Sequence, residues 1–114
     1  MIFVVVIVGL IRFIFIFIAT TRRRPAFCIL DISGRPITNL EPLMAAGGHS
    51  VIISGDLKEF LHVHPTEEVD LNWHGGPDIS FKTSFPKPGL YKAWGQFQHQ
   101  GIVITATGFV LKVA

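Results

Sequence analysis

The stretch Ile79-Ser80-Phe81-Lys82-Thr83-Ser84-Phe85 alternates between two kinds of side chain. Successive side chains of a strand point to opposite faces of a sheet, so the odd-numbered residues, mostly Ile and Phe, share one face and the polar even-numbered ones share the other. This pattern is typical of an antiparallel sheet with one face on a core and the other in water. Residues 79–85 therefore predict a half-buried strand.

The chain beyond Arg24-Pro25 repeats this character, with short apolar runs separated by turn residues about every ten residues. The expected strands cover residues 27–32, 49–54, 59–64, 78–85, 90–97 and 102–113. The segments between them are rich in Gly, Pro, Asp and Ser, which favour turns. No stretch has helical periodicity. Six strands without a helix predict an all-β domain, built as a two-sheet antiparallel sandwich or a small barrel, with the sandwich favoured.

Tyr91 comes just after the Pro-Gly turn at residues 86–89. That position is typical of a tyrosine corner, in which the phenol hydroxyl closes a loop by a hydrogen bond to the backbone. Trp94 lies further along the same expected strand. We therefore expect structural roles for Tyr91 and Trp94 rather than ligand binding.

The positive charge of the chain is concentrated near its start. Four of the ten basic residues are Arg12, Arg22, Arg23 and Arg24, and from residue 27 onward six Lys and Arg face eight Asp and Glu. The folded part is therefore slightly acidic and lacks the excess of positive charge that favours nucleic-acid binding. The single cysteine, Cys28, excludes a disulfide within the chain and is expected to act as a small buried hydrophobe.

Residues 1–20 are strongly apolar and predict a membrane anchor. As a helix with a rise of 1.5 Å per residue, residues 1–19 span about 28 Å, close to the thickness of a hydrocarbon core. Residues 21–26 would form a basic linker, and residues 27–114 the β-sandwich domain. Two features weaken the prediction of an anchor. The segment is rich in Val, Ile and Phe, which favour strands, and Arg12 in mid-membrane would cost about 2.5–3.5 kcal/mol.

The orientation of such an anchor is ambiguous. The basic cluster at residues 22–24 follows the apolar run, and by the positive-inside rule this would hold the domain in the cytoplasm, although we expect the domain to be extracytoplasmic. Three alternatives remain open for the segment: an unusual export signal, a first strand of the sandwich at residues 12–19, or a misplaced translation start.

Four side chains form the one constellation that suggests chemistry: His49, His62, His64 and Met44. His62 and His64 are two residues apart on an expected strand, so their imidazoles project from the same face. A hairpin turn at Gly55-Asp56 would bring residues 62–64 opposite residues 47–49 and add His49. Met44 lies five residues upstream of His49.

Imidazole with thioether suits copper, particularly Cu(I), whereas imidazoles alone suit zinc or copper equally. The expected cofactor is therefore a copper ion, with zinc as the alternative, and the choice depends on Met44. A purely structural alternative remains open, in which His62 and His64 are polar residues at a strand end and His49 bonds a loop carbonyl. His74 and His99 are expected in solvated loops, and Glu68 as an exposed charge.

Three motifs together resemble a bacterial family. They are the run from Asp31 to His49 ending in Gly48-His49, the run Phe60-Leu61-His62-Val63-His64-Pro65, and the run from Phe85 to Phe97. The chain is similar here to extracytoplasmic immunoglobulin-like domains of the YtkA-like and FixH-like groups, which accompany copper and other heavy-metal handling proteins. The resemblance implies an immunoglobulin-like (cupredoxin-like) sandwich and a metal role for His49, His62 and His64, with Met44 as the softer candidate. The partners it implies are metal-handling membrane proteins, while residues 1–20 themselves predict contact with the membrane.

Two other kinds of protein compete with a metal-binding accessory module. A cupin-like metalloenzyme would use His62, His64 and Glu68, but the second cupin motif needs a histidine just after a Pro-x-Gly turn, where this chain has Leu90-Tyr91-Lys92. No nucleophile, paired-carboxylate or phosphate-loop motif suggests another catalyst, so we expect no enzyme. An immunoglobulin-like module that binds a protein partner through a sheet face or edge, without a metal, is the stronger alternative.

Overall fold

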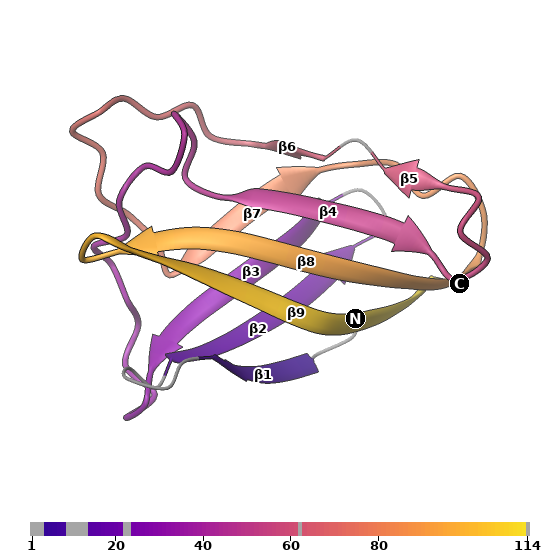
Figure 1. Cartoon of the computed structure of the whole chain (residues 1–114), viewed down its shortest axis with the longest axis horizontal. Coiled ribbons are helices and arrows are strands. Elements are labelled where there is room, and N and C mark those ends of the chain that lie inside the picture. Colours follow the sequence, from indigo (N-terminus) through magenta and orange to yellow (C-terminus); the bar gives the residue numbers. More distant parts are fainter. Residues whose placement is uncertain (1–3, 9–13, 22–23, 62, 114) are drawn as a thin grey trace.

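The computed structural model describes residues 4–8, 14–21, 24–61 and 63–113, and every helix or strand assigned in these ranges is a β-strand. The strands form two antiparallel sheets that pack against each other, as in a β-sandwich (Figure 1). The expected all-β, two-sheet architecture is confirmed.

The two sheets are unequal in size. The five-stranded sheet has the order β1 (Val4–Val8), β2 (Ile14–Thr21), β3 (Arg24–Asp31), β7 (Asp78–Lys82) and β6 (His64–Pro65). The four-stranded sheet has the order β5 (Phe60–Leu61), β4 (His49–Ser54), β8 (Gly89–His99) and β9 (Ile102–Val113). Because β1 lies beside β9 and β6 beside β4, the sheets approach each other along both sides.

The core between the sheets is centred on Phe27. Its ring meets those of Phe81, Phe97 and Phe109 edge to face, with centroids 5.6, 5.3 and 5.5 Å away, and all four side chains are fully buried. Phe27 and Phe81 come from the five-stranded sheet and Phe97 and Phe109 from the other. Edge-to-face packing of this kind stabilises beyond the burial of apolar area alone. One side chain of β3 thus joins both layers.

The alternation expected at residues 79–85 is confirmed. Ile79, Phe81 and Phe85 are buried, whereas Lys82 and Ser84 are exposed. The strand itself, β7, ends at Lys82, three residues earlier than expected.

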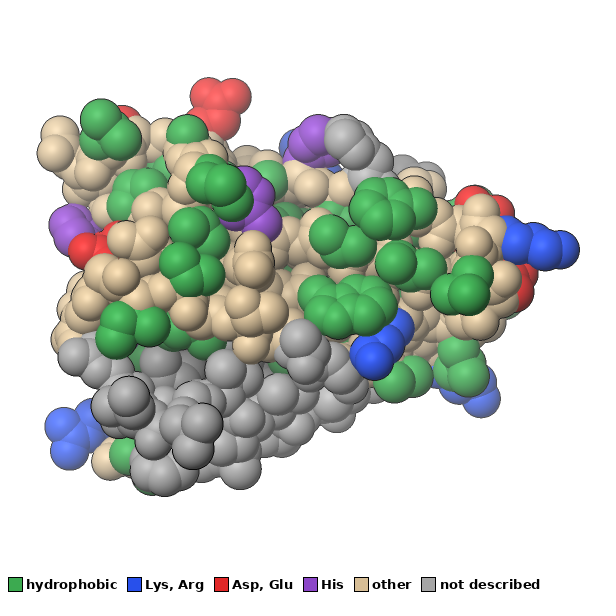
Figure 2. Space-filling model, viewed as in Figure 1, with side chains coloured by type: hydrophobic (Ala, Val, Ile, Leu, Met, Phe, Trp, Pro, Cys, Tyr) green, Lys and Arg blue, Asp and Glu red, His purple; other side chains and the backbone are tan. Residues whose placement is uncertain are grey.

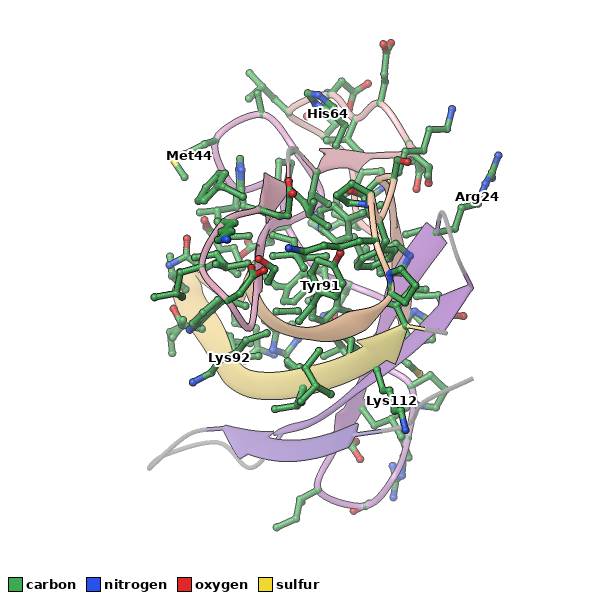
Figure 3. The ribbon with its side chains drawn as sticks, turned by 90° about the vertical axis from the view of Figure 1, so that its right-hand side faces the viewer. Arg24, Met44, His64, Tyr91, Lys92 and Lys112 are labelled. Carbon is green, nitrogen blue, oxygen red and sulfur yellow. The ribbon has the colours of Figure 1, made fainter. Side chains whose placement is uncertain are left out.

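The expected tyrosine corner is present. Tyr91 is buried, and its hydroxyl donates a hydrogen bond of 2.7 Å to the backbone carbonyl of Lys87, four residues upstream. The Tyr91 ring packs edge to face on Phe85 at 4.9 Å. The bond ties the loop between β7 and β8 to the core, and Figure 3 shows Tyr91 in the interior of the molecule.

The strand expected at residues 59–64 is divided in the structure. Phe60–Leu61 pairs with β4 in one sheet, and His64–Pro65 pairs with β7 in the other, with His64 opposite Lys82. The expected hairpin is therefore present, with Ile52 opposite Leu61, but His64 pairs with Lys82 of β7 and not with β4. Pro65 has no N–H to donate, so this segment suits a short strand at the edge of a sheet, which is where β6 lies.

The described part of the apolar N-terminal stretch is extended. β2 pairs with β3 from Ile14↔Asp31 to Thr21↔Arg24, and β1 pairs with β2. This matches the alternative of a sandwich strand near residues 12–19, and Val, Ile and Phe are strong strand formers. Among the described residues there is no helix long and apolar enough to cross a membrane.

The boundaries of the expected linker also differ. Thr21 closes β2 and Arg24 opens β3, so the described residues of the 21–26 stretch belong to sandwich strands, while residues 22 and 23 lie outside the described ranges. The sandwich accordingly begins before residue 27. The membrane anchor at residues 1–20 stays a prediction.

Candidate metal site at the start of β4

His49 opens β4, and the glycine before it makes that position possible. A Cβ atom on Gly48 would lie 2.6 Å from the ring of Phe97, a fully buried core residue, and 3.2 Å from the carbonyl oxygen of Gln96. Only glycine allows the chain to pass so close to β8. His49 is consequently held in register with Gln96.

The imidazole of His49 is anchored to the loop before it. Its Nε2 lies 2.7 Å from the carbonyl oxygen of Leu43, and a carbonyl only accepts, so Nε2 carries the proton and donates. In the neutral ring the lone pair then sits on Nδ1. A metal-binding histidine is commonly held by this kind of bond, from one ring nitrogen to a backbone carbonyl, while the other nitrogen binds the metal.

Met44 follows Leu43 at the tip of a two-residue turn. Leu43 and Ala46 exchange backbone hydrogen bonds of 2.7 and 3.1 Å, and Met44 and Ala45 between them have positive φ angles of 47° and 65°. Positive φ at both central residues is the pattern of a type I′ turn, normally made by Asn and Gly, and it costs a non-glycine residue roughly 1–2 kcal/mol. The turn holds the Met44 side chain 72% exposed.

His64 comes from a different sheet. It opens β6, is exposed, and stands opposite Lys82 of β7. β6 nevertheless lies beside β4, the strand that His49 opens. Figure 3 shows Met44 and His64 along the same side of the molecule, with the Met44 side chain directed away from its body. His62 lies outside the described residues.

The structure thus joins part of the expected constellation. His49 and Met44 belong to one loop, linked through the Leu43 carbonyl, and β6 brings the backbone of His64 to the neighbouring edge. Within the described ranges, no group of three His, Cys, Asp or Glu residues comes together that could hold a metal ion. The described residues therefore provide a partial site.

The structure contains the bond from His49 to a loop carbonyl that the purely structural alternative expects. Its partner could not be predicted, because neither Met44 nor Ala45 is a turn-forming residue and nothing in the sequence marks the tight turn that presents the Leu43 carbonyl. The only local signal is Gly47-Gly48 directly before His49.

The two remaining histidines, His74 and His99, are not among the expected metal ligands. His74 is exposed, as expected. His99 is not in a loop: it ends β8, and its Nε2 lies 3.0 Å from the side-chain oxygen of Asn39. Glu68 is exposed, as expected for an ordinary surface charge.

Cys28 is a half-buried residue of β3, and its thiol is unreactive. Burial, and after it the charge and hydrogen bond of Asp78 on the neighbouring strand, raise the pKa of the thiol to about 11. Since the thiolate is the form that binds soft metals, the ordinary state of Cys28 is a protonated, inert side chain.

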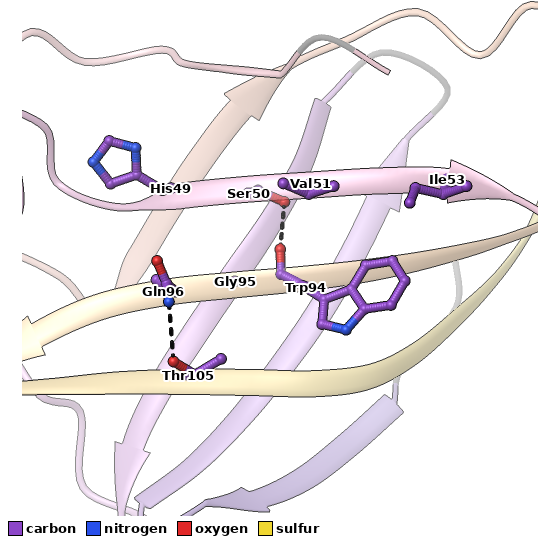
Figure 4. Close-up of a pocket in the computed structure, with 8 residues that line it drawn as sticks. All are labelled: His49, Ser50, Val51, Ile53, Trp94, Gly95, Gln96 and Thr105. Atoms are coloured by element: carbon purple, nitrogen blue, oxygen red, sulfur yellow. Dashed lines mark hydrogen bonds between the residues drawn. The ribbon is translucent and has the colours of Figure 1, made fainter. Parts of the chain in front are cut away.

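A groove begins at His49 and runs along the outer face of the four-stranded sheet (Figure 4). It has a volume of about 370 Å³ and is walled mainly by Val51, Ile53 and Trp94. Trp94 is half-buried and lines the outer side of the sheet, and its structural role stays a prediction. This orientation follows from strand alternation, because Tyr91 and Ala93 on the same strand are buried in the core.

Comparisons with known proteins place the chain in a family. The model of the family described as "Domain of unknown function (DUF8832)" matches residues 19–114, from the end of β2 through β9. The chain belongs to this family. No curated protein and no solved structure matched this DUF8832 domain. Its resemblance to the YtkA-like and FixH-like groups stays a prediction.

Proposed function

We propose that this DUF8832 domain is a non-catalytic module that binds a transition-metal ion at the start of β4, with copper favoured over zinc. The ligands we assign are His49, Met44, His62 and His64. The observation that carries the proposal is the hydrogen bond from His49 Nε2 to the Leu43 carbonyl, since it fixes the imidazole in the tautomer that can bind a metal through Nδ1.

The turn at residues 43–46 supports the choice of Met44. Two non-glycine residues in the left-handed region are unfavourable, and such conformations often mark functional segments. Here the turn does two things at once: it presents the thioether of Met44 to solvent and the Leu43 carbonyl to His49. A thioether adds affinity for Cu(I) and little for Zn(II), so Met44 would set the preference for copper.

A finer fold assignment accompanies the proposal. We propose that the sandwich is of the immunoglobulin-like (cupredoxin-like) type, and the tyrosine corner of Tyr91 supports this, because such corners are a feature of immunoglobulin-like domains. An extracytoplasmic location, membrane attachment through residues 1–20 and metal-handling membrane proteins as partners stay predictions of the sequence.

The test is a titration of the purified full-length chain with Cu(I) and Zn(II), each in competition with a chelator of known affinity. We expect one Cu(I) per chain, bound more tightly than Zn(II). Replacing His49, His62 and His64 together by alanine should abolish binding. Met44→Leu, which keeps the apolar volume and removes the sulfur, should weaken Cu(I) binding and leave Zn(II) binding unchanged.

The matched control is His74→Ala, which removes one exposed imidazole to which we assign no metal role. Circular dichroism of every variant checks that the sandwich is intact. If neither metal binds the folded chain, or if His74→Ala lowers affinity as much as His49→Ala, the proposal is wrong.

A protein-binding module without a metal is the second candidate. A separate observation favours it, namely the apolar outer face of the four-stranded sheet.

A further inference from the structure

The outer face of the four-stranded sheet carries several large, exposed apolar side chains. Its outward positions include large side chains with high exposure, among them Phe60 at 68%, Leu90 at 57%, Val103 at 50%, Val110 at 49% and Val51 at 37%. Figure 2 shows hydrophobic side chains gathered over the middle of β4 and β8. Contiguous exposed apolar patches on a small domain commonly mark an interaction site.

The charges on this face have one sign. The strands β4, β5, β8 and β9 contain no Asp or Glu. They contain two lysines, Lys92 and Lys112, both exposed, and Figure 3 shows Lys92 projecting from the body of the molecule. Lys92 lies over the Trp94 ring, 5.2 Å from its centroid, and Lys112 stands opposite Leu90.

The face is hollowed where its apolar side chains meet. The groove of about 370 Å³ lies between Val51 and Ile53 of β4 and Trp94 of β8, and the end at His49 is also lined by Gln96 and Thr105, whose side chains are hydrogen-bonded at 3.2 Å. The groove is therefore apolar along its length and polar at one end (Figure 4).

We propose that this outer face is the docking surface for a protein segment that places apolar side chains in the Val51-Ile53-Trp94 groove and carboxylates against Lys92 and Lys112. The apolar groove supplies the buried centre of the interface and Trp94 its aromatic anchor. The lysines select the partner by charge and speed its association. This surface does not require a metal.

Two other occupants fit less well. In a dimer with two-fold symmetry the same face of both copies would meet. The strands of that face offer lysines and no carboxylates, so Lys92 and Lys112 would find no opposite charge there. An anionic lipid surface would satisfy the lysines, but a hollow in a sheet face admits an inserted side chain better than it follows a bilayer surface.

The experiment selects binders from a displayed library of random peptides on the folded full-length chain, with parallel selection on Val51→Asp. We expect enriched peptides that combine Leu, Ile or Phe with Asp or Glu. Their affinity should fall as salt rises and should drop at least about tenfold on Val51→Asp, as for a residue at the centre of an interface. Leu71→Asp, at a leucine 88% exposed outside this face, is the matched control and should bind as the wild type does.

A second variant, with reversed charges, tests the surface even if Val51→Asp fails to fold. Lys92→Glu with Lys112→Glu changes only exposed side chains, and it should weaken the acidic peptides and favour versions in which Lys replaces their Asp and Glu. The proposal is overturned by enriched peptides without acidic residues, or by equal binding to the wild type and Val51→Asp. It is equally overturned if the face instead drives dimerisation or binding to phosphatidylglycerol vesicles.

Discussion

Tyr91 connects a single hydroxyl group to the stability of a whole loop. Its hydroxyl donates to the Lys87 carbonyl, and the ring is buried against Phe85. Tyr91→Phe keeps the ring and removes the donor, which leaves the carbonyl without this partner. We expect the free energy of unfolding to fall by about 1–2 kcal/mol in urea denaturation.

Ser84→Ala, at an exposed position, is the control and should change the free energy of unfolding by less than about 0.5 kcal/mol. Equal values for wild type and Tyr91→Phe would contradict a tyrosine corner.

Ala45 occupies a position better suited to glycine. Its φ of 65° lies in the left-handed region, where glycine is free of steric cost. We expect Ala45→Gly to raise the free energy of unfolding by about 0.5–1 kcal/mol, the relief of strain outweighing the larger entropy of the unfolded chain. Ala46→Gly, at the end of the same turn, should gain nothing. Thermal unfolding of the two variants compares them, and a loss of stability in Ala45→Gly would contradict the turn.

At this scale the sequence is informative where a residue carries its own geometric constraint. The Pro-Gly turn before Tyr91 predicted a bond that the structure contains. The bond from His49 to the Leu43 carbonyl depends on a tight turn whose central residues are Met44 and Ala45. Neither residue type favours such a turn, so Leu43 could not be predicted as the partner of His49.

Among the elements, an ion pair joins the loop before β8 to the turn after β4. Lys87 donates to the carboxylate of Asp56, which also accepts from the Ser54 hydroxyl and the Lys58 backbone. These bonds, that of Lys87 foremost, hold the pKa of Asp56 well below its usual range. The loops at this end of the sandwich are therefore fastened to each other by a solvent-exposed contact.

The pH dependence of stability follows from that direction. A lowered pKa in the folded state means that Asp56 stabilises the fold above the pKa of an unfolded Asp, about 3.9, and that this contribution is lost as the pH falls below it. We expect Asp56→Asn to reduce the loss of stability between about pH 5 and pH 2, measured by urea denaturation across that range. Glu68→Gln, an exposed loop carboxyl, should leave the profile unchanged.

The limits of prediction at this scale appear at residues 59–64. The run reads as one strand, yet its two halves pair in different sheets. Period-two alternation identifies a strand but not the sheet in which it pairs, because that depends on where the chain crosses between layers. Because of this crossing, His64 pairs with Lys82 of β7 and not with β4.

For the whole molecule, stability depends on the aromatic centre that joins the two sheets. Phe27 meets three phenylalanines from both layers. We expect Phe27→Ala to lower the free energy of unfolding by about 3–5 kcal/mol, as a cavity forms at the centre of the core. Phe60→Ala, at a phenylalanine 68% exposed, should cost little by comparison. Similar losses in both variants, measured by denaturation, would show that Phe27 is not central.

The architecture could be predicted from short alternating runs, whereas the extent of the sandwich could not. The apolar stretch before residue 21 has the length of a membrane helix and the composition of strands, and both descriptions fit a sequence viewed alone. In the described residues β2 is paired with β3 from Ile14 to Thr21, which fits the strand description.

The most direct test of the metal proposal is X-ray absorption spectroscopy of the Cu(I)-loaded chain, in a Cys28→Ser background that removes the thiol. We predict imidazole nitrogens together with one sulfur around copper. The sulfur should disappear in Met44→Leu, and the nitrogen shell should lose amplitude in His49→Asn. Copper with no sulfur neighbour, or a spectrum that neither substitution changes, would contradict a site built on the loop that carries Met44 and His49.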